Sequence, residues 1–189
     1  GVYNMALTLF NLPQTLIVAI SISIIPAIAA ACAKRNFPKA TQTSEQAMRL
    51  AATLALPAAA GLLSLAAPIM HLLYPLKPDE AAAGAPMLAI LSLAVVFVAM
   101  VSLTNSTLQA VGRVMVPVFT MLAGGVVKLI VNYTLVGTPE VGIHGAPIGT
   151  TLCYGTITVL NLIYLVRKTK LGIRIKSVFL RPFVSACAM

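Results

Sequence analysis

The segment APMLAILSLAVVFVAMVSLTNSTLQAVGRVMVPVFTMLAGGVVKLIVNYTLV (residues 85–136) decides the fold of this chain. It contains two long apolar blocks, residues 85–109 and 114–136, and the turn between them carries a single charge, Arg113. An α-helix that rises 1.5 Å per residue needs about 20 apolar residues to cross the roughly 30 Å hydrocarbon core of a bilayer. The segment therefore predicts two membrane-spanning helices joined by a tight turn.

The rest of the chain repeats this pattern. Of its 189 residues, 59% are hydrophobic and 9% are charged, against roughly 45–50% and 25% in a soluble domain. Further apolar blocks cover approximately residues 7–33, 48–74 and 146–166. Continuous apolar runs exclude the alternating pattern of transmembrane strands. We predict an all-α, polytopic membrane helical bundle with about five transmembrane helices and, at 177–189, the start of a sixth.

Proline and glycine predict local features of these spans. Pro13 and Pro26 should kink the first helix, and Pro57 and Pro68 should interrupt the second. Gly145 and Gly149, four residues apart, fit either a close helix–helix contact or a flexible loop that meets a helix.

The distribution of charge predicts the topology. The chain has a net charge of +9, and eleven of its thirteen Lys and Arg residues fall on one side of the predicted membrane. By the positive-inside rule, loops 34–49, 110–115 and 167–176 are cytoplasmic. Clustering in loops rather than on one helix face also argues against a nucleic-acid partner. We expect a multi-pass membrane protein.

Both ends of the chain give the impression of a cut through a larger protein. The chain starts at Gly1 without a signal peptide, and the apolar segment 177–189 stops before it could span a membrane. We expect residues 1–176 to form one unit and residues 177–189 to begin a further transmembrane helix, both within a larger protein.

Polar residues in the spans fall into four stripes, each on one face of a helix. Two interpretations stay open, interhelical hydrogen bonds that hold the bundle together and the wall of a water-filled substrate path. The stripes are Asn4, Asn11, Gln14 and Ser21; Ser102, Asn105, Ser106 and Gln109; Thr120, Gly124, Lys128 and Asn132; and Thr150, Tyr154, Thr158 and Asn161.

Lys128 is the sharpest single feature because it lies within a span without an acidic residue nearby in the sequence. An unpaired Lys near the centre of a membrane helix costs about 2.5–3.5 kcal/mol. Either its long side chain reaches the outer surface, or it contacts an anion in a cavity. His71 and His144 are isolated and receive no role.

The sequence shows no pattern typical of an enzyme. It lacks a phosphate-binding glycine-rich loop, a nucleophile–base arrangement and a pair of carboxylates in one pocket. Cys32, Cys153 and Cys187 have no metal-ligand or disulfide spacing. We therefore predict a transporter without a cofactor or a metal site.

Three segments resemble a known family. They are YNMALTLFNLPQTLIVAISISIIPAIA (residues 3–29), LTNSTLQAVGRVMVPVFTMLAGGVVKLIVNYTLV (residues 103–136) and GIHGAPIGTTLCYGTITVLNL (residues 142–162). Together they resemble the stage V sporulation protein B group of polysaccharide and lipid II flippases. This group belongs to the multidrug/oligosaccharidyl-lipid/polysaccharide exporter superfamily.

The resemblance implies a transporter of the bacterial cell (plasma) membrane with a central cavity between two lobes, like that of the multidrug and toxin extruders. Residues 1–176 would be its C-terminal lobe, which packs against an N-terminal lobe, and the five spans would be its helices eight to twelve. It implies a substrate that is a lipid-linked oligosaccharide or a lipid II-type cell-wall precursor, moved from the inner to the outer leaflet by alternating access. The partners would be membrane lipids, this lipid-linked saccharide and the N-terminal lobe. By resemblance, the residues that line the substrate path are Asn11, Gln14, Asn105 and Gln109, and more weakly Lys128 and Asn132.

Two other functions stay open. One is a cation-coupled multidrug extruder of the same superfamily, although such extruders generally need a carboxylate in the membrane. The other is a non-transporting membrane scaffold for the assembly of the envelope or the spore.

Overall fold

The architecture is given by a computed structural model that describes residues 2–75, 77–136 and 145–168. Within these residues the structure is entirely helical, and five of its helices are long and apolar enough to cross a membrane. The helices are α1 (Val2–Ala33), α2 (Phe37–Ser64), α3 (Ala66–Leu73), α4 (Pro78–Ala110), α5 (Met115–Val136) and α6 (Gly145–Lys168). Only α3 is too short to span. The predicted all-α membrane bundle is confirmed, whereas residues 177–189 lie outside the described part.

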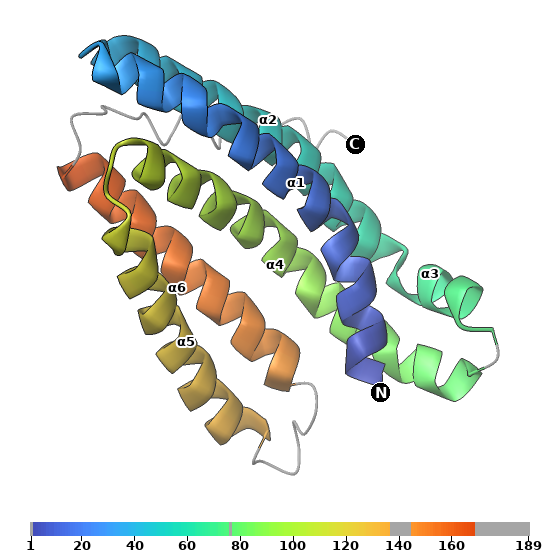
Figure 1. Cartoon of the computed structure of the whole chain (residues 1–189). Helices are drawn as coiled ribbons and strands as arrows, with labels where there is room; N and C mark the ends of the chain where they lie inside the picture. Colours follow the sequence, from blue (N-terminus) through green and yellow to red (C-terminus); the bar gives the residue numbers. More distant parts are fainter. Residues whose placement is uncertain (1, 76, 137–144, 169–189) are drawn as a thin grey trace.

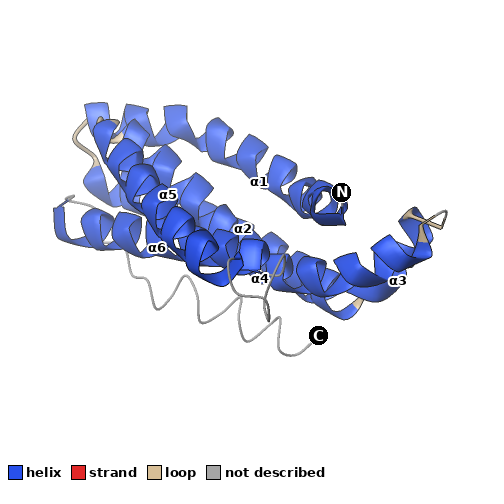
Figure 2. Cartoon of the chain, turned by 90° about the horizontal axis from the view of Figure 1, so that it is seen from below, coloured by secondary structure: helices blue, strands red, loops and turns tan. Residues whose placement is uncertain are grey.

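Helix α4 is the centre of the bundle. It packs against α1, α2, α3 and α6, and its buried side chains include Leu88, Leu91 and Leu103. Helix α5 packs mainly against α6 and touches α4 only weakly. Figures 1 and 2 show the result: α1 and α2 lie on one side of α4, and the α5–α6 hairpin lies on the other. The hairpin is thus attached to the rest of the chain mostly through α6.

The ends of the helices separate by charge. Figure 1 shows the α1–α2 turn, the α4–α5 turn and the C-terminal end of α6 at the same end of the bundle. The basic residues of this end are Lys34, Arg35, Lys39, Arg113, Arg167 and Lys168. The opposite end holds the start of α1, helix α3 and the start of α4. Three basic ends on one side are what the positive-inside rule requires, so this end is the cytoplasmic one.

The predicted loop 34–49 was wrong, because the connection between α1 and α2 is much shorter. Only residues 34–36 connect the helices, because α2 already begins at Phe37. The Asn36 side chain accepts a hydrogen bond from the Lys39 backbone N–H at 3.2 Å and caps the helix, and Pro38 suits its first turn. Glu45 and Arg49 pair one turn apart at 3.8 Å. The polar residues of this segment therefore extend a helix.

The second predicted span, 48–74, is divided into two helices. Helix α2 continues through Pro57, but the chain breaks at Leu65 before α3 begins. Pro68 explains the break, since it has no N–H to donate to the carbonyl of Ser64 and its ring would clash with that carbonyl. The membrane span is therefore α2, and α3 is a separate short helix at the outer end.

Helix α4 begins earlier than predicted, and it ends at Ala110 in the tight turn that the sequence predicts. Pro78 lies in its first turn with Asp79 and Glu80, whose charges suit a helix N-terminus, so the helix starts before residue 85. At the other end Gly112 has a φ of 81°, and the Arg113 N–H donates to the carbonyl of Leu108 at 2.8 Å. This left-handed glycine ends the helix and forms the tight turn into α5.

The first helix is continuous through both of its prolines. The structure assigns Val2–Ala33 to one helix that contains Pro13 and Pro26, and Figure 1 shows α1 changing direction along its length. The fourth and fifth spans begin and end within two residues of the predicted bounds.

Candidate functional site

Helix α1 presents unpaired amides on its surface. Asn4 and Asn11 are exposed and Gln14 is half-buried, and none of the three side chains has a hydrogen-bond partner within the described residues. The hydroxyls of Thr8 and Thr15, by contrast, donate to carbonyls of their own helix at 2.9 and 2.8 Å. Unpaired amides in contact with lipid would be costly. This face of α1 therefore suits water or protein rather than lipid.

The two candidates on α4 have different surroundings. Gln109 is exposed at the last turn of the helix, and its side chain has no partner in the described structure. Asn105, one turn earlier, is buried, and its Oδ1 accepts a hydrogen bond from Asn161 at 2.7 Å. Gln109 is thus free to meet a ligand, whereas Asn105 already holds two helices together.

Asn161 is the centre of a buried polar network that joins α4, α5 and α6. Its side chain is fully buried, and its Nδ2 donates to Asn105 Oδ1 and, at 3.1 Å, to Thr104 Oγ1. The hydroxyl of Thr120 donates to Asn161 Oδ1 at 2.7 Å. Both ends of the amide are satisfied, as a buried polar group requires. For Asn105, Thr120 and Asn161 the interpretation as interhelical contacts holds.

The predicted stripe on α5 follows the contact with α6. Thr120 bonds to Asn161, and Gly124 lies so close to α6 that an added Cβ would meet the Ile157 side chain and come within 3.2 Å of the Cys153 carbonyl. Further along, Asn132 packs against Gly149, where an added Cβ would lie 3.2 Å from its Cγ. The predicted close helix–helix contact at Gly149 is confirmed. Small residues let the two backbones approach here.

Lys128 lies at the border of this contact. It is half-buried, and the ion pairs of the described residues, Arg49–Glu45 and Lys77–Glu80, leave it without a carboxylate partner. An open groove of about 610 Å³ runs along α5 from Val118 to Asn132, and Gly125 and Lys128 are among its lining residues. Apart from Lys128 and Asn132, its lining is apolar. The groove thus offers a cation and an amide within an apolar surface.

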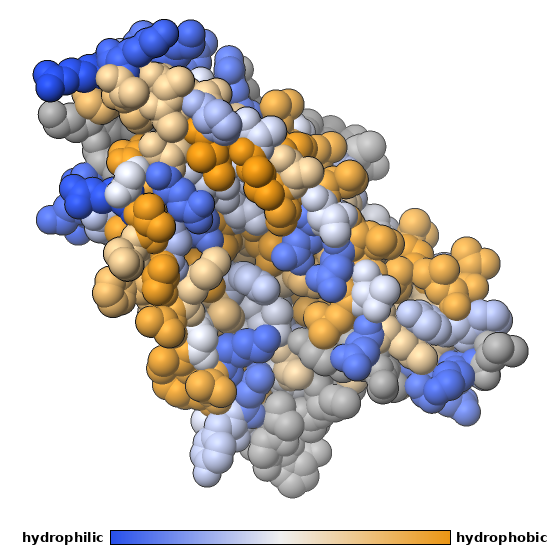
Figure 3. Space-filling model, in the orientation of Figure 1, coloured by the Kyte–Doolittle hydropathy of each residue, from blue (hydrophilic) through white to orange (hydrophobic). Residues whose placement is uncertain are grey.

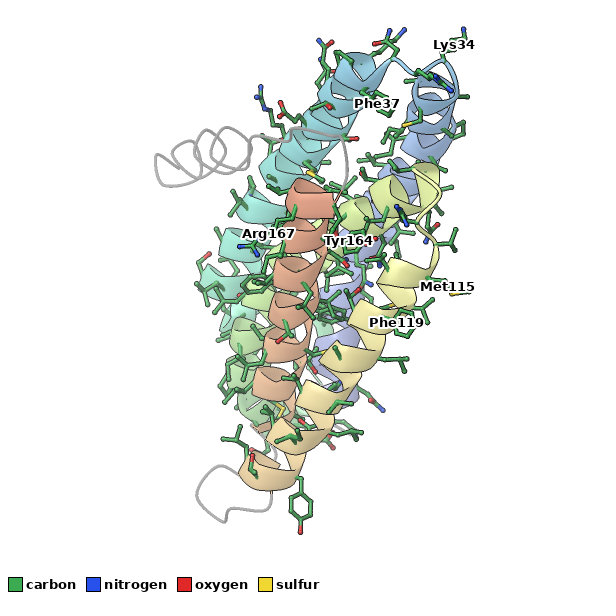
Figure 4. All side chains as sticks on the ribbon, turned by 90° about the vertical axis from the view of Figure 1, so that its left-hand side faces the viewer. Lys34, Phe37, Met115, Phe119, Tyr164 and Arg167 are labelled. Carbon is green, nitrogen blue, oxygen red and sulfur yellow. The ribbon has the colours of Figure 1, made fainter. Side chains whose placement is uncertain are left out.

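Large apolar side chains cover much of the remaining surface of α5. Figure 4 shows Met115 and Phe119 projecting from α5 away from α6, and both side chains are 68% exposed. Figure 3 shows hydrophilic side chains over α1 and over the α5–α6 hairpin on one face of the molecule, separated by apolar surface. The polar groups of the spans are therefore gathered at particular places on the bundle.

The structure divides the six predicted path residues. Asn11, Gln14 and Gln109 have no side-chain partner in the described part of the chain, Lys128 and Asn132 lie along the groove of α5, and Asn105 is in the buried network. The sequence singled out neither Thr120 nor Asn161 as a site residue. Their positions on the polar stripes were the available signal, but periodicity does not tell which residue of another helix each one meets.

The remaining candidates of the sequence add little to this site. His71 is exposed and Cys153 is buried without a disulfide, whereas His144 and Cys187 fall outside the described residues. The Oδ1 of Asn132 is buried without a hydrogen-bond partner among the residues described. Amides and a lysine can bind hydroxyl and phosphate groups.

The fold and these polar faces define a multi-pass protein of the cell membrane. The family model "Lipid II flippase MurJ" matches residues 1–189, and the chain belongs to this family of flippases, which are transporters and not enzymes. The match does not distinguish the stage V sporulation protein B group, so that finer assignment stays a prediction.

A curated relative supports the membrane assignment. The chain is 26% identical over 168 residues to "Uncharacterized membrane protein YabM" of Bacillus subtilis (strain 168). The match covers 89% of this chain and 30% of the relative. The chain thus spans about a third of the length of this relative.

Proposed function

We propose that this chain is the C-terminal lobe of a flippase that moves a lipid II-type cell-wall precursor, or a related lipid-linked oligosaccharide, from the inner to the outer leaflet. Alternating access between this lobe and an N-terminal lobe would carry the headgroup across the membrane. The membership of the MurJ family supports a flippase of this kind. The choice of sugar, and the link to sporulation, go beyond that membership.

The observation that carries the proposal is the exposed amide face of α1. Asn11 and Gln14 have no partner in the described structure, although they lie within a helix long and apolar enough to span the membrane. Such side chains avoid lipid, and a sugar headgroup offers many hydroxyls to an amide, which both donates and accepts hydrogen bonds. We assign Asn11, Gln14 and Gln109 to the wall of the substrate path.

Charge supports a phosphate-bearing substrate. Lys128 has no carboxylate partner among the described residues, so an anion on the substrate would be its natural counter-ion. We place Lys128 and Asn132 in the path as secondary contacts. Asn105 is buried and bonded to Asn161, so it would support the wall of the path without touching the substrate.

The first alternative is a cation-coupled multidrug extruder. Such a transporter generally needs a carboxylate within the membrane. The carboxylates of the described residues are Glu45, which pairs with Arg49, and Asp79 and Glu80 in the first turn of α4. None lies in the middle of a span, which favours the flippase. A membrane scaffold without transport is the second alternative.

Depletion of the full-length protein in its host separates these functions. A flippase predicts that the lipid-linked precursor accumulates on the cytoplasmic leaflet, measured by enzymatic labelling of the outward-facing headgroup. A normal leaflet distribution with altered dye efflux would favour the extruder. If neither quantity changes while the envelope is misassembled, the scaffold is the better account.

The assignment of α1 has its own test. Asn11→Leu and Gln14→Leu should each reduce restoration of precursor transport in the depleted host, with protein levels unchanged. Leu16→Ala is the matched control, because Leu16 is 67% exposed on the same helix and offers no hydrogen bond. Equal restoration by all three variants would remove α1 from the path.

A further inference from the structure

Asn161 occupies a special place because it connects two helices that hardly touch each other. Its Nδ2 donates to Asn105 Oδ1 of α4 at 2.7 Å, and its Oδ1 accepts from the hydroxyl of Thr120 of α5 at 2.7 Å. Helices α4 and α5 are in contact only weakly, whereas both pack against α6. The amide therefore ties the orientation of α5 to the central helix of the bundle.

The other contacts between α5 and α6 are close packing contacts, which fix how near the two helices lie. At Gly124 and Gly149 the helices approach through the absence of a side chain, and their neighbours are Ile157 and the pair Val131 and Asn132. A hydrogen bond adds to this packing a constraint on direction, because it weakens steeply as its angle departs from linearity. The hydroxyl of Thr120 thus contributes a directional contact to this interface.

The rotation of α5 decides where its half-buried polar residues point. Lys128 follows Thr120 by two helical turns, or about 12 Å along the axis, and Asn132 follows one turn later. Both residues line the groove on α5, at the edge of the contact with α6. A small rotation of the helix would move Lys128 into the contact or away from it.

We propose that Asn161 is a positioning residue, which sets the rotation of α5 about its axis through Thr120 and thereby holds Lys128 and Asn132 at the groove. Asn161 touches no substrate in this role. Its importance for transport rests on the proposed function, because the direction of the Lys128 side chain affects transport only if Lys128 faces the substrate. The rotation of α5 itself is independent of any substrate.

The test uses Thr120→Val, which keeps the shape of the side chain and removes its donor, and Thr120→Ser, which keeps the hydroxyl. The reporter is Gly125→Cys in the full-length protein, because Gly125 lines the groove next to Lys128 and has open space for a Cβ. Gly155→Cys on α6 is the matched control, with equally open space. The measurement is the rate of labelling by a water-soluble maleimide in membranes, corrected for the native cysteines.

An interhelical hydrogen bond in a membrane is worth about 0.6 kcal/mol, which corresponds to about a threefold change in a rotational equilibrium. We therefore expect Thr120→Val to change the labelling rate of Gly125→Cys by about threefold or more, in either direction. Thr120→Ser should restore the original rate, and Gly155→Cys should label at the same rate in all backgrounds.

Two results would overturn the proposal. One is an unchanged labelling rate of Gly125→Cys in the Thr120→Val background. The other is an equal change at Gly155→Cys, which would indicate general loosening of the bundle. Asn161→Leu serves as a second variant if Thr120→Val is poorly produced. A shift in labelling in a protein that transports no lipid-linked precursor would contradict the proposed function and leave the positioning role intact.

Discussion

Thr120 and Asn161 lie 41 residues apart in the sequence, and the structure joins their side chains by a buried hydrogen bond of 2.7 Å. The same Asn161 amide reaches Asn105, 56 residues away, on the central helix. Because there is no water in the bilayer core, the buried amides of Asn105 and Asn161 depend on protein groups for their hydrogen bonds. The contact connects the polar faces of three spans inside the lobe.

The first prediction concerns the stability of this network. Asn161→Ala leaves Asn105 Oδ1 without its partner in a buried site, whereas the hydroxyls of Thr104 and Thr120 can still donate to carbonyls of their own helices. We expect the free energy of unfolding to fall by about 1–3 kcal/mol. The measurement is unfolding of the purified full-length protein in mixed detergent micelles. Asn11→Ala is the control, and it should change stability by less than about 0.5 kcal/mol, because Asn11 is exposed. Equal effects of the two variants would contradict the network.

The second prediction concerns the glycines of α5. Gly124→Ala brings a Cβ within 2.7 Å of Ile157 Cδ1 and 3.2 Å of the Cys153 carbonyl. We expect a loss of about 1–3 kcal/mol, the usual cost of overpacking. The neighbouring Gly125 has open space around it, so Gly125→Ala should be neutral or should stabilise the helix slightly. The same unfolding measurement compares the two variants. A more harmful effect at Gly125 would show that the hairpin packs differently.

The third prediction concerns Arg35 in the α1–α2 turn. Its φ of 54° lies in the left-handed region, which is costly for a residue with a side chain. The turn keeps this conformation because the Asn36 N–H donates to the Ala31 carbonyl at 2.9 Å and ends α1. Arg35→Gly should therefore raise the free energy of unfolding by about 1 kcal/mol. Arg35→Val should lower it, since a β-branched residue is least tolerant of positive φ. A loss of stability with glycine would refute the assignment of strain.

The fourth prediction concerns the charge of Lys128. If this residue contacts an anionic group of the substrate, Lys128→Ala should reduce transport more than Lys128→Arg, which keeps the charge. Lys77→Ala is a suitable control, since Lys77 pairs with Glu80 at the outer surface. The assay is restoration of precursor transport in a depleted host. Full activity of both Lys128 variants would instead favour a lysine that merely extends toward the membrane surface.

Much of the fold could be predicted from the sequence because hydropathy and loop charge act locally. A span must be apolar over its whole length whatever its neighbours are, so the blocks 114–136 and 146–166 differ from α5 and α6 by only one or two residues at either end. The boundaries of α2 and α4 were less well predicted. Polar helix formers after Phe37 and the acidic first turn after Pro78 continue helices beyond the apolar blocks.

The candidate site was predicted in part. Periodicity placed Asn11, Gln14, Gln109 and Lys128 on polar faces, and the structure leaves these side chains without partners among the residues described. Periodicity could not distinguish these four residues from Asn105, which lies on an equally regular stripe but is buried. The difference depends on α6, whose Asn161 meets Asn105 only after the helices have packed.

By itself the sequence determined that this chain crosses a membrane about five times, because only a long apolar helix is stable in lipid. It also determined that the basic loops lie inside, because positive charges next to a span keep a loop on the cytoplasmic side during insertion. Only the tertiary structure decided which polar residues bind each other and which stay free. Hydrogen bonds between helices, such as that of Thr120 with Asn161, depend on the rotation and depth of each helix in the bundle, and neither follows from the sequence of one helix alone.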